Sequence, residues 1–155
     1  MKSTFSHGVL HLEKNCATTT NAAAGADITG VSGQTFSSAS FTLASTSQCQ
    51  GGSPRFNVTT TSTTFFLGCN NVTPTINADG TATHTFTAAT IAAGRNRVPV
   101  PTGTITGVQI VLDVQATADL TRIFFNGTLG APGAGHRGWQ APHEASVPAR
   151  SRPRA

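Results

Sequence analysis

The sequence predicts an all-β fold, an antiparallel β-sandwich or jelly roll, and three observations lead to this expectation. The 155 residues include 26 Thr and 12 Ser, and the β-branched Thr side chain suits a pleated strand better than a helix. Short segments alternate between apolar and polar residues, and turn signals separate them at intervals of roughly 8–14 residues. No segment has a sustained helical period. We therefore expect about six to eight short strands in two sheets.

The ordered domain is expected between residues 27 and 130. Its first strand is expected within residues 28–45, where Phe36 or Phe41 and Leu43 would point inward. The alternation is imperfect in this segment. The run QGGSP that follows is a turn signal, because glycine adopts positive φ angles and proline fixes its own.

The clearest hairpin is predicted at residues 55–67. In RFNVTTT, Phe56 and Val58 fall on one face of a strand while Asn57 and Thr59 fall on the other. Such a period of two is typical of a strand that buries one face. A short Thr-Ser-Thr connection leads back into TTFFLGC, so the two segments are expected to pair.

A second pair of strands is predicted at residues 72–76 and 81–88. The connection between them contains Asp79-Gly80, a strong signal for a tight turn. His84 lies in register with Phe86 on the second strand. This register favours a partly buried structural histidine over a functional one.

The last strands are predicted at residues 108–115 and within residues 117–128. Pro99 and Pro101 come before them and mark a loop or edge, because proline cannot donate to a sheet ladder. Apolar and polar residues then alternate from Val108 onward, and an Asn-Gly turn closes the final strand.

The two ends of the chain are expected to be poorly ordered. Residues 1–26 are predicted to be a leader or linker, and residues 131–155 a disordered tail rich in Pro, Gly and Arg. No complete export signal is visible, because polar residues interrupt the early apolar stretch. Either such a signal has been removed, or the protein is cytosolic with reduced cysteines. We favour export. The interrupting residues are His7, His11, Glu13 and Lys14.

Charged residues are scarce, and most of the net positive charge comes from the tail. Charged residues make up 10% of the chain and the net charge is +4. Residues 1–128 contribute only +1 of this, from six basic and five acidic side chains, and the rest comes from the Arg-rich tail. Short basic runs are usually solvated, so nucleic-acid binding is not expected. No apolar stretch is long enough for a membrane span.

Three cysteines allow one disulfide and leave one thiol over. Cys49 and Cys69 are the expected pair, because they flank the predicted hairpin whereas Cys16 lies in the predicted leader. Closing a loop of about 20 residues stabilises a fold by about 3 kcal/mol in the chain-entropy picture. Two buried free thiols are the alternative.

The sequence contains no recognisable catalytic motif. It lacks a nucleophile elbow, a phosphate loop and a paired-carboxylate pattern, so we expect a protein that is not an enzyme and that holds no cofactor or metal. Asp113 and Asp119 flank one turn and are the only pair considered for Ca²⁺. Asn57, Asn71 and Asn126 match the glycosylation pattern, which a chain this rich in Asn, Ser and Thr contains by chance. Two groups of His and Glu have metal-ligand chemistry, but neither is expected to bind a metal, because both lie in segments expected to be poorly ordered. They are His7, His11 and Glu13, and His136, His143 and Glu144.

The segment CQGGSPRFNVTTTSTTFFLGC, followed by TGVQIVLDV and RIFFNGTLG, resembles a domain of secreted bacterial proteins of unknown function. The shared features are a GGSPRF turn, an aromatic strand that ends in Gly-Cys, a late strand with a central Asp, and an Asn-Gly-Thr close. The resemblance covers roughly residues 36–130. It implies an exported β-sandwich with no assigned activity. The two ends of the chain depart from the pattern.

The expected function is therefore that of a binding module, secreted or displayed at the cell surface. Recognition of an extracellular ligand such as a carbohydrate is the first hypothesis, because loops on a rigid scaffold often carry binding sites. It requires polar side chains beside an exposed aromatic ring. The alternative is a structural role in which open edge strands pair with other copies.

Overall fold

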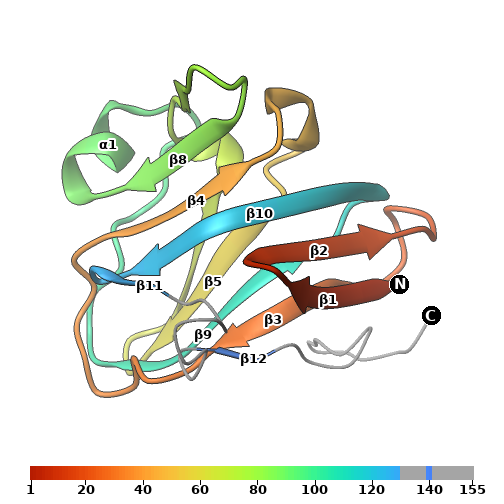
Figure 1. Ribbon diagram of the computed structural model, residues 1–155. Helices are drawn as coiled ribbons and strands as arrows, with labels where there is room; N and C mark the ends of the chain where they lie inside the picture. Colours follow the sequence, from red (N-terminus) through yellow and green to blue (C-terminus); the bar gives the residue numbers. More distant parts are fainter. Residues whose placement is uncertain (130–138, 141–155) are drawn as a thin grey trace.

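The computed structural model describes residues 1–129 and 139–140. Two antiparallel sheets pack face to face in a sandwich-like arrangement (Figure 1), as the alternating segments predicted. The longest strands follow the strongest alternation in the sequence. The predicted hairpin at residues 55–67 is present. The two long strands predicted after Pro101 are also present, at Ile105–Leu112 and Ala116–Phe125.

Sheet A contains seven strands in the described part of the chain. Its order is β1-β2-β10-β4-β8-β7, with β11 paired to β10. Asn126 and Gly127 connect β10 to β11 with φ angles of 51° and 82°, the backbone that an Asn-Gly turn favours. The strands are β1 (Lys2–Ser6), β2 (Val9–Lys14), β4 (Ala39–Leu43), β7 (Thr75–Ile76), β8 (Ala82–Phe86), β10 (Ala116–Phe125) and β11 (Thr128–Leu129).

Sheet B has the order β12-β3-β9-β5-β6. The strand pairings of the two sheets together form a nested series along the chain: β2 pairs with β10 and β4 with β8 in sheet A, while β3 pairs with β9 and β5 with β6 in sheet B. The chain therefore crosses repeatedly between the sheets. The strands are β3 (Ala24–Ile28), β5 (Arg55–Thr60), β6 (Thr64–Gly68), β9 (Ile105–Leu112) and β12 (Trp139–Gln140).

Phenylalanine fills the space between the sheets. Phe41, Phe56, Phe86 and Phe125 are fully buried, and adjacent ring centroids lie 5.5–6.0 Å apart in tilted or edge-to-face contacts. Such arrangements suit the aromatic quadrupole. Leu43 is also fully buried, as predicted. The core therefore depends on apolar rings that need no hydrogen-bond partner.

The prediction of a poorly ordered leader at residues 1–26 is wrong, and so is the predicted domain start at residue 27. Leu10 and Leu12 of β2 are buried, while His11 and Glu13 lie outward. Two of the polar residues that interrupt an export signal, His11 and Glu13, are thus the outward positions of a strand with period two. A turn at His7 and Gly8, with φ angles of 52° and 78°, joins β1 to β2.

Lys14 holds the connection from β2 to β3 in place. Its side chain is 1% exposed, and Nζ donates to the carbonyl oxygens of Thr18, Thr20, Ala22 and Asp113 at 3.0–3.3 Å. A buried ammonium requires such partners. The Ala- and Thr-rich segment that we predicted to be a linker is thus folded around a cation.

Two further expectations need correction. Ala88–Ala93 form a short helix, α1, whose start is capped by Thr87 through a capping box with Thr90; at six residues it is too short to show a helical period. The segment 72–76 forms strand only at β7.

The predicted disorder of residues 131–155 lies outside the described residues, except that Trp139 and Gln140 form β12. This strand pairs with β3, which would otherwise expose its ladder groups.

Short 3₁₀ turns flank the two cysteines, η1 (Thr46–Gln48) before the first and η2 (Cys69–Asn71) at the second. None of the helices in the described part of the chain is long and apolar enough to cross a membrane.

Candidate functional site

Cys49 and Cys69 form the predicted disulfide. Their Cα atoms lie 5.9 Å apart, and 20 positions separate the two residues in the sequence. The bond joins the end of η1 to the start of η2. Cys16 is a free thiol near the exposed loop that follows β2. The disulfide fixes one end of the sandwich, where the loops after β4, β6 and α1 meet.

Three polar side chains and one phenylalanine form a row across the outer face of sheet B. The ladder pairs Asp27 with Gln109, Gln109 with Asn57, and Asn57 with Phe66. The neighbouring positions on each strand are buried in the core, so these four side chains point outward. We call them the polar row. Three strand spacings of about 4.8 Å make the row about 14 Å long.

The amides of the polar row are only half used within the described residues. Gln109 donates from Nε2 to Oδ1 of Asp27 at 3.0 Å, and Asn57 accepts at Oδ1 from Nε of Arg55 at 2.7 Å. These bonds leave Oε1 of Gln109 free as an acceptor and Nδ2 of Asn57 free as a donor. The row thus offers an oriented acceptor and donor on adjacent strands.

A hollow of about 540 Å³ lies along the polar row. Gly107 forms part of its floor, and a Cβ atom placed there would meet nothing within 4 Å. Thr59 and Thr106 line the same hollow and add hydroxyl groups. The missing side chain of Gly107 therefore opens space beside Asn57 and Gln109.

Phe66 ends the polar row and is 49% exposed. The guanidinium carbon of Arg55 lies 5.2 Å from the centre of its ring, a cation–π distance. Arg55 is itself held by Asp113 through Nη1 and by Asn57. The ring is therefore an apolar surface in a fixed position, next to hydrogen-bonding groups.

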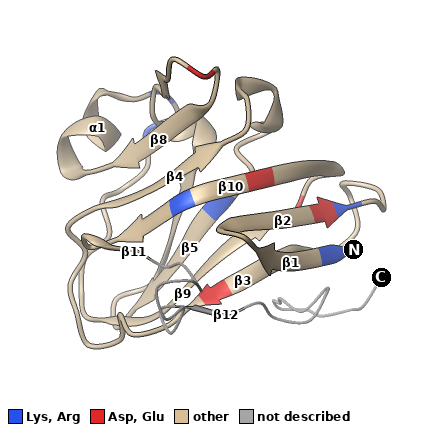
Figure 2. Cartoon of the chain, viewed as in Figure 1, with Lys and Arg blue, Asp and Glu red and all other residues tan. Residues whose placement is uncertain are grey.

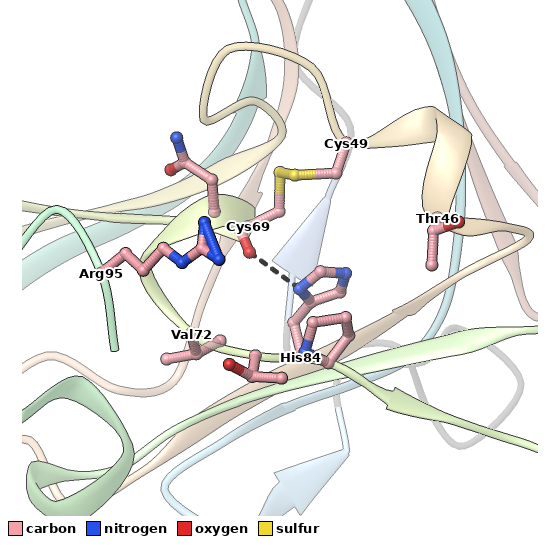
Figure 3. Close-up of a pocket in the computed structure, with 9 residues that line it drawn as sticks. Thr46, Cys49, Cys69, Val72, His84 and Arg95 are labelled. Atoms are coloured by element: carbon pink, nitrogen blue, oxygen red, sulfur yellow. Dashed lines mark hydrogen bonds between the residues drawn. A yellow bond between two sulfur atoms is a disulfide. The ribbon is translucent and has the colours of Figure 1, made fainter. Parts of the chain in front are cut away.

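A second pocket, of about 310 Å³, lies beside the disulfide (Figure 3). His84 of β8 lines it and is 2% exposed. Nδ1 of His84 lies 2.9 Å from the carbonyl oxygen of Cys69, and because a carbonyl only accepts, Nδ1 carries the proton. Nε2 has no hydrogen-bond partner among the described residues. His84 is more fully buried than the predicted partly buried histidine, and its Nε2 is a buried acceptor without a partner at the wall of the pocket.

The protonation state of His84 follows from its surroundings. Burial lowers the pKa of His84 below the ordinary 6.5, because the charged ring would lose its solvation; the hydrogen bond to Cys69 opposes this more weakly. The ring is therefore neutral near pH 7. With the proton on Nδ1, Nε2 presents a lone pair.

His11 lies in the opposite kind of environment, on the outer face of sheet A. Its Nδ1 is 2.7 Å from Oδ1 of Asp119 and its Nε2 is 3.3 Å from Oε1 of Glu13. The hydrogen bond with Asp119 raises the pKa of His11, against the effect of partial burial. Gln48 also donates to Asp119 at 3.1 Å. The hydrogen-bonding groups of these four side chains are therefore paired with one another.

The metal candidates from the sequence do not come together as sites. Asp113 pairs with Arg55 and Asp119 with His11, so the two carboxylates considered for Ca²⁺ serve different cations. Within residues 1–129 and 139–140, no cluster of three or more His, Cys, Asp or Glu side chains could hold a metal ion. The cluster at residues 136–144 and the basic tail lie outside the described residues.

Charged side chains are few and are distributed over both sheets (Figure 2). Of the three glycosylation candidates, Asn71 is buried and accepts from the backbone N–H of Gly68, and Asn126 accepts from those of Ser37 and Ser38. Both are structural. Asn57 belongs to the polar row.

No protein-family model, curated protein or solved structure matches the chain. The resemblance to secreted bacterial domains therefore stays an expectation. What the chain shows is a small all-β fold with one disulfide and two candidate sites, the polar row and the pocket beside the disulfide.

Proposed function

We propose that the protein is a non-enzymatic, exported binding module whose polar row binds a carbohydrate. The observation that carries the proposal is the polar row itself, in which a free amide donor and a free amide acceptor lie between a hollow and an exposed aromatic ring. Sugars present hydroxyl groups that both donate and accept, and an Asn and a Gln side chain complement such groups.

Phe66 supplies the apolar part of such a site. The C–H bonds on one side of a sugar ring are weakly positive and pack against the negative face of an aromatic ring. Arg55 and Asp113 keep the ring in place, so little side-chain freedom is lost on binding. A glycan lying along the row would contact Phe66 at one end and enter the hollow at Gly107 toward the other.

Two further observations, the fold and the disulfide, independently support the proposal. The nested pairing of β2 with β10, β3 with β9, β4 with β8 and β5 with β6 supports a jelly-roll description, and jelly rolls include lectin domains. This support is an analogy of fold. The disulfide is compatible with an oxidising compartment outside the cytosol.

A glycan array probed with the full chain tests the proposal. We expect specific binding that the Phe66→Ala variant loses by about tenfold or more, with unchanged stability because the ring is half exposed. Phe124→Ala is the matched control, since Phe124 is an exposed phenylalanine on sheet A. Equal binding by the two variants would contradict the proposal.

The size of the protein on the same sample tests the alternative. β6 forms an outer edge of sheet B, and an open edge can pair with another copy. A silent array together with concentration-dependent large species would favour self-assembly through this edge over carbohydrate binding.

A further inference from the structure

The pocket beside the disulfide has a chemistry different from that of the polar row. His84 and Arg95 are the ionisable side chains that line it, and no acidic side chain does. The remaining wall is formed by neutral polar and apolar groups, with the disulfide across the top of Figure 3. An anion entering this pocket would meet no like charge.

His84 provides an acceptor that the protein does not use. Its ring is held by the bond from Nδ1 to the Cys69 carbonyl and by the ring of Phe41, whose centre is 5.4 Å away. Nε2 points away from Cys69, toward the side of the pocket where Thr46 lies (Figure 3). Buried polar atoms are nearly always paired. The group that fits Nε2 is an O–H or N–H donor.

Arg95 provides a cation at the other side. It follows α1, lies opposite Thr46 across the pocket (Figure 3), and is exposed. No hydrogen bond or ion pair joins its guanidinium to a described residue. Guanidinium groups bind carboxylates through two parallel hydrogen bonds, so a carboxylate is the natural complement of this side chain.

We propose that this pocket binds a small hydroxylated carboxylate, with a hydroxyl donating to Nε2 of His84 and the carboxylate bound by Arg95. A volume of about 310 Å³ is at the lower end of small-molecule sites, which suits one sugar-sized unit. The same chemistry occurs in a free hydroxy acid and in an acidic sugar residue of a glycan. This site is distinct from the polar row and does not depend on the function proposed for it.

Calorimetric titration of the full chain with matched small molecules tests the proposal. Glucuronate carries both groups, glucose lacks the carboxylate, and acetate lacks the hydroxyl. We expect binding of glucuronate and much weaker binding of glucose and acetate. If glycolate binds as well as glucuronate, the ligand is a free hydroxy acid; if glucuronate alone binds, the ligand is an acidic sugar.

Two variants distinguish this pocket from general attraction of an anion to a basic protein. Arg95→Gln should weaken glucuronate binding by about ten- to hundredfold, the usual range for a charged hydrogen bond. Arg97→Gln removes the same charge two residues away, outside the pocket lining, and should change nothing. Equal losses in the two variants, or no binding of glucuronate to the unaltered chain, would overturn the proposal.

The imidazole nitrogens of His84 give a readout that needs no variant. Their NMR shifts in the unaltered protein should move at Nε2 and not at Nδ1 when glucuronate is added, because only Nε2 gains a donor. Phe66→Ala should leave this response intact, which separates a failure here from a failure of the carbohydrate proposal for the polar row. Binding without any change at Nε2 would contradict the role of His84.

Discussion

On the outer face of sheet A, His11 lies between Glu13 and Asp119, and Gln48 donates to the same aspartate. On the outer face of sheet B, Gln109 and Asn57 lie side by side with one donor and one acceptor free. Both faces are built from neutral or charged polar side chains on neighbouring strands. Where such groups satisfy one another they stabilise the fold, and where they are left half used beside a hollow they can bind something else.

Removing the disulfide is expected to have the largest effect on the stability of the fold that carries both faces. The double variant Cys49→Ala, Cys69→Ala should lower the free energy of unfolding by about 3 kcal/mol, measured by urea denaturation. The polar row is held by the ladder of sheet B, so carbohydrate binding by the folded protein should persist. Cys16→Ala is the control, because Cys16 is a free thiol. A double variant as stable as this control would contradict the role of the disulfide.

Filling the hollow should break the binding face while leaving the fold intact. In Gly107→Leu the new side chain has open space, since a Cβ atom at this position meets nothing within 4 Å. Carbohydrate affinity should fall by tenfold or more, about 1.4 kcal/mol, with little change in unfolding. Gly107→Ala should cause a smaller loss. Full affinity in Gly107→Leu would show that the hollow is not part of the site.

The smallest effect is expected on sheet A and depends on pH. The hydrogen bond with Asp119 raises the pKa of His11, so this contribution to stability is complete below the ordinary 6.5 and is lost as pH rises through the raised value. Partial burial raises the pKa of Asp119, but the hydrogen bonds from His11 and Gln48 outweigh it and the pKa falls below 3.8. The contribution of Asp119 is present above 3.8 and is lost as pH falls through the lowered value.

The pair should therefore stabilise the fold most between pH 3.8 and 6.5. Both side chains are about one-third exposed, and solvent screening limits such pairs to about 0.5 kcal/mol. A double-mutant cycle with His11→Gln and Asp119→Asn, followed by urea denaturation at pH 5 and pH 9, should show coupling at pH 5 only. Coupling that grows toward pH 9 would contradict the assignment.

The sequence predicted the parts of the fold that local patterns determine. Apolar and polar residues alternate in β5 and β9, β6 returns from β5 across a short connection, and the pairing of Cys49 with Cys69 follows from that hairpin. The sequence did not predict β1 and β2, because the polar residues at outward strand positions also interrupt the apolar stretch of an export signal. The cap formed by Thr87 and Thr90 and the four alanines of α1 are the local signals that could have revealed the helix.

The candidate sites depend on contacts between distant parts of the chain. Asp27 and Gln109 meet only because β3 and β9 pair in one register, and a slip of one strand by one residue would turn its own side chain toward the core. His84 was predicted to be buried, but its unpaired nitrogen depends on the position of the Cys69 carbonyl. No local pattern records either arrangement.

The most direct test of the carbohydrate site is NMR titration of the ¹⁵N-labelled full chain with a glycan that binds on the array. The side-chain amide groups of Asn57 and Gln109 are observed separately in such spectra. Binding at the polar row predicts that both amides shift together with the backbone of Gly107, while His11 and its neighbours on sheet A stay unchanged. Saturable binding that shifts sheet A and leaves both amides in place would contradict it.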